Sequence, residues 1–300
     1  MSWALWLGEI AALAGALLWA IASVLYARVG QQIPPLVLNL LKGAIAIALL
    51  GVTLLVQRAV LPPVSAIVVI QLGLSGVIGI GLGDTAYLAA LNSLGARRAL
   101  LLETLAPPFS AILAWVVLGE RLSGVAIAGI LVTLTGVGWV IAERTATGES
   151  ECYPQRWGLL WGLLAELAQA SGAVLSRSAL ATSSITPLWS SLIRLIGGEV
   201  IIIGLLLSNR LRQPLSLNSI SWTKRGLLAI GLAAVGGTYL GIWLQQTALK
   251  FAPTGIAQTL LATSPLFVLP LVALLGERIT LRSLLGVAIA VIGIALLFNA

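Results

Sequence analysis

The sequence predicts an all-α, polytopic membrane protein with ten transmembrane helices, arranged as two inverted five-helix repeats. Hydrophobic residues make up 59% of the 300 residues and charged residues only 9%, and the mean hydropathy is +1.06. A soluble domain of this size has about a quarter of its residues charged. Apolar runs long enough to cross a bilayer recur throughout the chain, and its two halves resemble each other. Lipid is therefore the expected solvent for most of the surface.

The individual spans follow from run length, because a helix needs about 20 apolar residues to cross the hydrocarbon core. Charged residues, proline or asparagine bound the runs, and Asp84 and several glycines interrupt the third. The alternating ten-residue pattern of transmembrane strands is missing. The expected helices cover residues 5–27, 34–57, 68–93, 98–118, 122–142, 157–180, 186–208, 225–249, 254–275 and 279–298.

An internal repeat organises these spans. The segment PFSAILAWVVLGERLSGVAIAG, which begins at Pro108, matches PLFVLPLVALLGERITLRSLLG, which begins at Pro265, an offset of 157 residues. Gly129 and Gly136 correspond in this alignment to Gly286 and Gly293. The repeats are predicted to cover residues 5–143 and 157–298. With five helices in each, the second must be inverted relative to the first, a plan that recurs in secondary transporters.

These features resemble the drug/metabolite transporter superfamily, and in particular its ten-helix EamA-type members. The resemblance rests on Gly15-Ala16-Leu17-Leu18-Trp19 in the first helix, a Pro-to-Lys/Arg spacing in helices two and seven, the repeated Pro-x(10)-Gly-Glu-Arg pattern, and the twin glycines. It implies an alternating-access carrier of small organic metabolites or amphipathic compounds, often an exporter, in the cell (inner) membrane. One departure is Gln169, which stands where the first half has Trp19.

Charged residues inside the spans are the first candidates for a site, because a charge at the bilayer centre costs at least about 3 kcal/mol without a partner or a water-filled cavity. Glu9 is expected nearer the membrane interface. The candidates within the spans are Lys42, Asp84, Glu103, Glu166, Arg194 and Glu199.

Glu166 is the leading candidate for proton coupling. It shares a helical face with Gln169, and the stretch Leu164-Ala165-Glu166 is similar to the acidic first helix of small multidrug resistance proteins. That similarity implies proton exchange at the glutamate. The alternative is that Glu166 only pairs with a buried cation such as Arg194.

Two further carboxyl groups have equally open interpretations. Asp84 shares a face with Tyr87, and it could serve the site or simply neutralise Lys42. Glu103 precedes Pro107 by four residues, and proline cannot donate the helical hydrogen bond that the Glu103 carbonyl would accept. This predicts either a broken helix that binds solute at mid-membrane or a structural kink.

Aromatic and amide side chains complete the candidate cavity. Tyr239, Trp243 and Gln246 share a face of helix eight, and Trp19 and Ser23 share a face of helix one. Such a wall suits a moderately polar organic solute, although helix packing explains the same stripe. The repeated Gly-Glu-Arg is expected to shape a turn and not a site.

Composition also limits the alternatives. The net charge of +7 comes from scattered basic residues, which does not indicate nucleic-acid binding. With one cysteine and no histidine, we expect no metal, no cofactor and no enzyme activity, although an intramembrane enzyme or a non-transporting scaffold remains the alternative. The expected partners are a small-molecule substrate, the lipid bilayer and protons, with the chain acting as a monomer or homodimer. Basic residues favour the loops after odd-numbered helices, which would place both termini outside; the family resemblance implies the reverse, and both orientations stay open.

Overall fold

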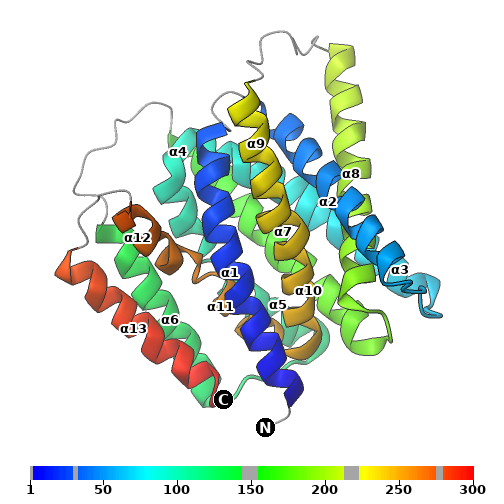
Figure 1. Cartoon of the computed structure of the whole chain (residues 1–300). Coiled ribbons are helices and arrows are strands. Elements are labelled where there is room, and N and C mark those ends of the chain that lie inside the picture. The colour runs from blue at the N-terminus through cyan, green and yellow to red at the C-terminus, as the bar shows by residue number, and fades with distance from the viewer. Residues whose placement is uncertain (1–2, 30–32, 144–154, 213–222, 275–279) are drawn as a thin grey trace.

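The structure, a computed structural model, describes residues 3–29, 33–143, 155–212, 223–274 and 280–300. Every regular element in these ranges is helical, and Figure 1 shows them packed into one bundle in which the start of α1 and the end of α13 lie at the same end. The elements are α1 (Trp3–Val29), α2 (Pro35–Val56), α3 (Ala66–Gly76), η1 (Val77–Asp84), α4 (Thr85–Glu103), α5 (Ala106–Leu118), α6 (Gly124–Glu143), α7 (Gln155–Thr182), α8 (Pro187–Arg212), α9 (Lys224–Ala233), η4 (Ala234–Leu240), α10 (Gly241–Phe251), α11 (Thr254–Leu261), α12 (Ser264–Leu274) and α13 (Leu281–Leu297).

Eight helical segments within the described ranges are long and apolar enough to cross a membrane, and they correspond to the first eight expected spans. The expected ninth span is divided into α11 and α12 by a turn at Ala262 and Thr263, and the tenth, α13, is a shorter apolar helix. The chain is also helical from Ala66 to Glu103, across the boundary expected between spans three and four. Apolar run length therefore located the membrane segments but not their interruptions.

The two π-helices occupy equivalent positions in the repeats. η1 begins at Val77 and η4 at Ala234, which are separated by the same 157 residues that relate the Gly-Glu-Arg segments. Both are rich in glycine, and each continues directly into α-helix on both sides. A π segment inside an α-helix changes the direction of the side chains that follow, and such segments are frequent at functional sites.

Helices α6 and α13 lie side by side (Figure 1) through the twin glycines. A methyl group on Gly129 would lie 3.2 Å from the carbonyl oxygen of Gly293, and one on Gly136 would lie 2.6 Å from the carbonyl oxygen of Gly286. The pairing is antiparallel and reciprocal, since the first glycine of each repeat opposes the second glycine of the other. Small residues allow this close backbone approach between helices in a membrane.

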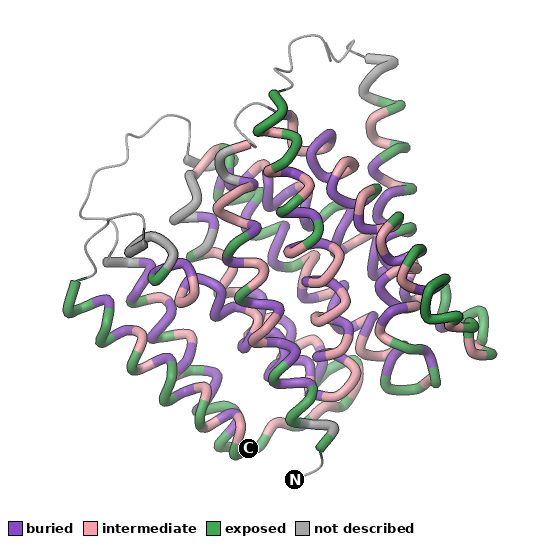
Figure 2. Tube along the Cα trace, in the orientation of Figure 1, coloured by how far each residue is buried: buried purple, intermediate pink, exposed green. Residues whose placement is uncertain are grey.

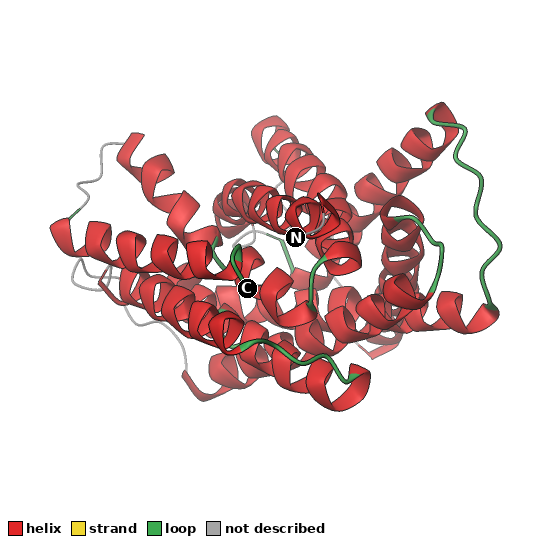
Figure 3. Ribbon diagram, turned by 90° about the horizontal axis from the view of Figure 1, so that it is seen from below, coloured by secondary structure: helices red, strands yellow, loops and turns green. Residues whose placement is uncertain are grey.

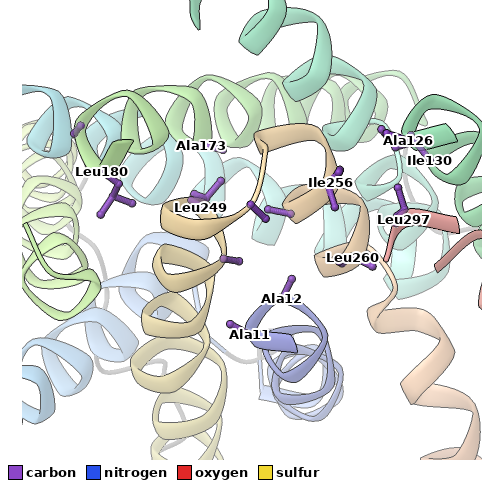
Figure 4. Close-up of a cluster of buried hydrophobic side chains, with 14 of the residues drawn as sticks. Ala11, Ala12, Ala126, Ile130, Ala173, Leu180, Leu249, Ile256, Leu260 and Leu297 are labelled. Atoms are coloured by element: carbon purple, nitrogen blue, oxygen red, sulfur yellow. The ribbon is translucent and has the colours of Figure 1, made fainter. Parts of the chain in front are cut away.

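Burial separates the interior of the bundle from its outer face (Figure 2), where large apolar side chains such as Trp115, Leu131 and Ile292 are exposed. Viewed from below (Figure 3), helices occupy the middle of the bundle as well as its edges, and loops connect them. One buried apolar cluster joins both halves of the chain, with Ala12 of α1, Ile130 of α6, Ala173 of α7 and Leu260 of α11 among its members (Figure 4). An apolar exterior over internally satisfied helices is the arrangement that lipid requires.

Gly136 provides a test of the α6–α13 contact. Gly136→Ala forces a methyl group against the backbone of α13, so we expect a loss of about 1–3 kcal/mol in stability, measured by thermal unfolding in detergent. Gly138→Ala is the matched control, because a methyl group there meets no atom within 4 Å and alanine favours helix by up to about 1 kcal/mol. Equal unfolding temperatures for the two variants would contradict close packing at Gly136.

Candidate functional site

A cavity of about 110 Å³ lies between the two halves of the chain, within the part that the structure describes. Residues from eight of the ten expected spans line it, and both charged and aromatic groups are among them. Its lining comprises Gly15, Trp19, Lys42, Ile80, Asp84, Tyr87, Glu103, Ala106, Glu166, Gln169, Arg194, Gly237, Thr238, Gly241, Ile242, Gln245, Gln258, Leu261 and Ala262.

The cavity is located where regular α-helix is interrupted in both repeats. η1 contributes Asp84 and η4 contributes Thr238. Glu103 borders the turn between α4 and α5, and Ala262 lies in the turn between α11 and α12. Interrupted helices at membrane depth are stable only where they face protein or a polar cavity. Residues 104 and 105 form a turn, and the prolines at 107 and 108 lie in the first turn of α5, so the helix break predicted beside Glu103 is confirmed.

Asp84 is the most connected group of the cavity. One carboxylate oxygen accepts from the Nζ of Lys42 in a buried ion pair, and the other accepts from the Nε2 of Gln169 at 2.7 Å. The Lys42 ammonium also lies 5.9 Å from the ring centre of Trp19 and 5.8 Å from that of Tyr26, which adds cation–π attraction. The neutralising pair that the sequence suggested is therefore present, and it ties α2, η1 and α7 together.

The other two carboxyl groups of the cavity are less well partnered. Trp19 Nε1 donates to one oxygen of Glu103 at 3.0 Å. Glu166 is 2% exposed, and its Oε2 has no hydrogen-bond partner among the described residues. Glu103 and Asp84 both act electrostatically on Glu166, so three acidic groups from three different spans share one small polar space.

Arg194 is also buried, and it has no countercharge among the described residues. It is 1% exposed, and its Nη1 donates to Oε1 of Gln245 at 2.8 Å. Its Nε has no partner, and no carboxylate oxygen of the described residues lies within ion-pair distance of it. The suggested pairing of Glu166 with Arg194 is therefore wrong. Gln245 holds the guanidinium on the α10 side of the cavity, and Asp84 is already occupied by Lys42 and Gln169.

The structure brings most of the predicted site residues together. Trp19, Tyr87 and Gln169 line the cavity, as do all the charged candidates except Glu199: Lys42, Asp84, Glu103, Glu166 and Arg194. Ser23 does not, because its hydroxyl donates to the carbonyl oxygen of Ala20 on its own helix.

The predicted face of helix eight is the wrong one. Tyr239 bonds to Thr53 of α2 at 2.7 Å, Trp243 packs against Tyr239, and Gln246 accepts from Ser190 of α8 at 2.8 Å. The neighbouring flank, with Thr238 and Gln245, faces the cavity instead. Helical periodicity identifies residues on one face but not the element that each face meets.

Gln245 and Gln258 are the main site residues that sequence reasoning missed. Each is an amide inside a long apolar run, which costs free energy in a membrane unless it is satisfied. That signal was available, because glutamines are rare in the predicted spans. Gln258 lines the cavity through α11, and its Nε2 has no partner in the described part of the chain.

Two acidic residues of the described ranges are buried outside the cavity. Glu9 is fully buried, and neither of its carboxyl oxygens has a hydrogen-bond partner among the described residues. The neighbouring Gly8 packs against Ala252, so the start of α1 is covered by other helices. The Glu199 carboxyl group lies against Gly43 of α2, beside Lys42.

The first Gly-Glu-Arg does more than shape a turn. Gly119 has the left-handed backbone (φ 68°) that ends α5. Glu120 then accepts from Arg177 Nε at 2.7 Å and from the backbone N–H of Thr254 at 2.8 Å. Arg177 also donates to the carbonyl oxygens that end α10. This cluster, here called the Glu120–Arg177 tie, joins the first half of the chain to the second. Its sequence twin, Glu277-Arg278, lies outside the described residues.

The Lys42–Asp84 pair can be tested by a double-mutant cycle. Lys42→Met and Asp84→Asn each leave a buried charge without its partner, at a cost of about 3–5 kcal/mol. We expect the double variant to unfold, in a detergent thermal melt, at a higher temperature than either single variant. Additive losses in the double variant would rule out direct coupling between the two groups.

Comparison with known proteins agrees with this architecture. The sequence profile of the EamA-like transporter family matches residues 6–142 and 156–299. A comparison with curated proteins gives no match. Among 29 similar chains of solved structures, one described as "Crystal structure of protein" has a TM-score of 0.76 at 18% identity, over 96% of this chain and 95% of that chain. That likeness concerns the fold alone, whereas the profile covers both halves of the sequence. The chain is a multi-pass membrane protein and belongs to the EamA-like transporter family.

Proposed function

We propose that this protein is a secondary transporter that moves a small organic solute across the cell (inner) membrane through the central cavity, in the direction of export. The observation that carries the proposal is a pair of buried charged side chains, Glu166 and Arg194, that face one cavity. Neither forms an ion pair within the described structure, and Glu166 Oε2 and Arg194 Nε have no hydrogen-bond partner there. Unpaired buried charge lowers stability, so its presence at mid-bundle is accounted for by a ligand that enters and leaves.

Alternating access is supported by the relation between the repeats. We propose ten spans, with the interrupted α11–α12 pair as the ninth and α13 as the tenth. Reciprocal contacts between Gly129 and Gly293 and between Gly136 and Gly286 are those that a two-fold axis in the membrane plane would generate. Inverted repeats of this kind exchange conformations around a fixed site between them.

The Glu120–Arg177 tie is suited to closing one end of the pathway. It connects the α5–α6 turn to α7, the end of α10 and the start of α11. Helices α5 and α11 both border the cavity, through Ala106 and Gln258. Opening the pathway at this end requires these contacts to separate.

Glu166 is the proposed site of proton coupling. A carboxyl group that alternates between a closed cavity and water can bind a proton on one side and release it on the other. Glu103 already has the indole N–H of Trp19, and Asp84 has two donors. Oε2 of Glu103 and Oε2 of Glu166 are both buried and unpartnered in the described structure, but Glu166 differs in that no described donor bonds to either of its oxygens.

The transport hypothesis is tested by counterflow of labelled solutes in proteoliposomes. We expect accumulation of label driven by excess unlabelled solute inside, without chemical change of the solute. An intramembrane enzyme would instead form product without a gradient, and a scaffold would give neither result.

For proton coupling, Glu166→Gln should abolish pH-driven transport but preserve counterflow, because the amide fills the same space and cannot exchange a proton. Glu9→Gln is the matched control, a buried carboxyl group outside the cavity, and it should keep both activities. Unchanged pH-driven transport in Glu166→Gln would remove the coupling role.

A further inference from the structure

We propose that Arg194 is the subsite for an anionic group on the solute, either a carboxylate or a phosphate. The solute class is then small organic anions, including zwitterions, and not lipophilic cations. The inference rests on the proposed function, since it assigns the ligand of the same cavity.

The first step is the orientation of the guanidinium. Gln245 accepts from Nη1, which leaves the opposite edge of the group, formed by Nε and Nη2, for a ligand. Nε is buried with no partner among the described residues. The Nε and Nη2 hydrogens are parallel, so this edge matches two oxygens of one carboxylate or phosphate.

The second step is the position of the group. A methyl group on Gly79 would lie 2.7 Å from Nη2, and a methyl group on Gly76 would collide with the Arg194 backbone carbonyl. These glycines of α3 and η1 allow α8 to pack closely and leave room for the guanidinium. Arg194 is therefore held in place by shape and by Gln245, without a countercharge among the described residues.

The third step is that the acidic groups nearby are engaged elsewhere or too distant. Asp84 attracts Arg194 electrostatically, but its two oxygens are taken by Lys42 and Gln169. No carboxylate in the described structure makes an ion pair with Arg194. An anion that enters the cavity supplies the missing charge.

Two of the other unpartnered groups of the cavity favour the same ligand chemistry, and the remaining two, Oε2 of Glu103 and Oε2 of Glu166, suit the ammonium group of a zwitterion. The Nε2 of Gln258 and the hydroxyl of Tyr87 line the cavity, and neither makes a hydrogen bond within the described residues. Each can donate, as Arg194 Nε does. A solute with several acceptor oxygens would satisfy all three, whereas a lipophilic cation would satisfy none.

The test uses the purified full-length protein and matched pairs of probes that differ in charge but hardly in shape: acetate and acetamide, propionate and propionamide, benzoate and benzamide. Methyl phosphate and benzylamine complete the set. Affinity is measured from the ligand-dependent rise in unfolding temperature. We expect one or more of the anions to bind, its neutral amide to bind at least about tenfold more weakly, and benzylamine not to bind.

The variants assign that binding to Arg194. Arg194→Gln should weaken anion binding by about tenfold to a hundredfold. The affinity of Arg194→Lys should lie between those of Arg194→Gln and the wild type, because an ammonium group cannot make the bidentate hydrogen bonds of a guanidinium. Arg282→Gln removes an exposed cation outside the cavity and should bind as the wild type does. If Arg194→Gln does not fold, weaker anion binding by Arg194→Lys still carries the test.

Three results would overturn the assignment: equal binding of an anion and its amide, undiminished binding by the folded Arg194 variants, or no binding by any anion of the set. Counterflow separates this from the wider proposal. If only benzamide or benzylamine shows counterflow, the transport proposal stands and the anion subsite is ruled out. If an anion binds only when Arg194 is present but shows no counterflow, the result supports the subsite and contradicts the transport proposal.

Discussion

The constraint on which this structure depends is that polar groups within a bilayer must find their partners inside the protein. The Lys42–Asp84 pair meets it at the centre of the bundle, where Asp84 also accepts from Gln169 and Lys42 faces two aromatic rings. These contacts hold α2, η1 and α7 around the cavity. The remaining side chains of the site are arranged around a charge pair that is already neutral, so Arg194 and Glu166 are left to interact with what enters.

Irregular helices provide the space for that arrangement. η1 and η4 lie at equivalent positions of the two repeats. A turn also separates α4 from α5, and another separates α11 from α12. All four interruptions border the cavity. Glycines at 76 and 79 allow α8 to approach this region closely enough for the Arg194 guanidinium to reach it. If the helices were uninterrupted and larger residues stood at positions 76 and 79, side chains would fill the cavity.

Stability and function have opposite requirements at this site. Arg194 and Glu166 are both nearly inaccessible to solvent and incompletely hydrogen-bonded within the described structure, which disfavours folding. The apolar cluster that joins α1, α6, α7 and α11, together with the glycine contacts of α6 and α13, supplies packing elsewhere in the bundle. A transporter needs such a division, because a fully satisfied cavity would gain nothing from binding a solute.

Composition, run length and the 157-residue repeat were sufficient to predict a helical membrane protein, its first eight spans and the charged residues of its cavity, because burial of charge in lipid leaves few places for Lys42, Asp84, Glu166 and Arg194. Only the tertiary structure decided the partners of these groups. Arg194 meets Gln245 rather than Glu166, Glu120 meets Arg177, and helix eight turns Gln245 rather than Gln246 toward the cavity. Sequence periodicity distinguishes a buried face from a lipid-facing one. Which buried flank meets which neighbour depends on helix packing and on the π segments, and both are set by contacts between residues far apart in the chain.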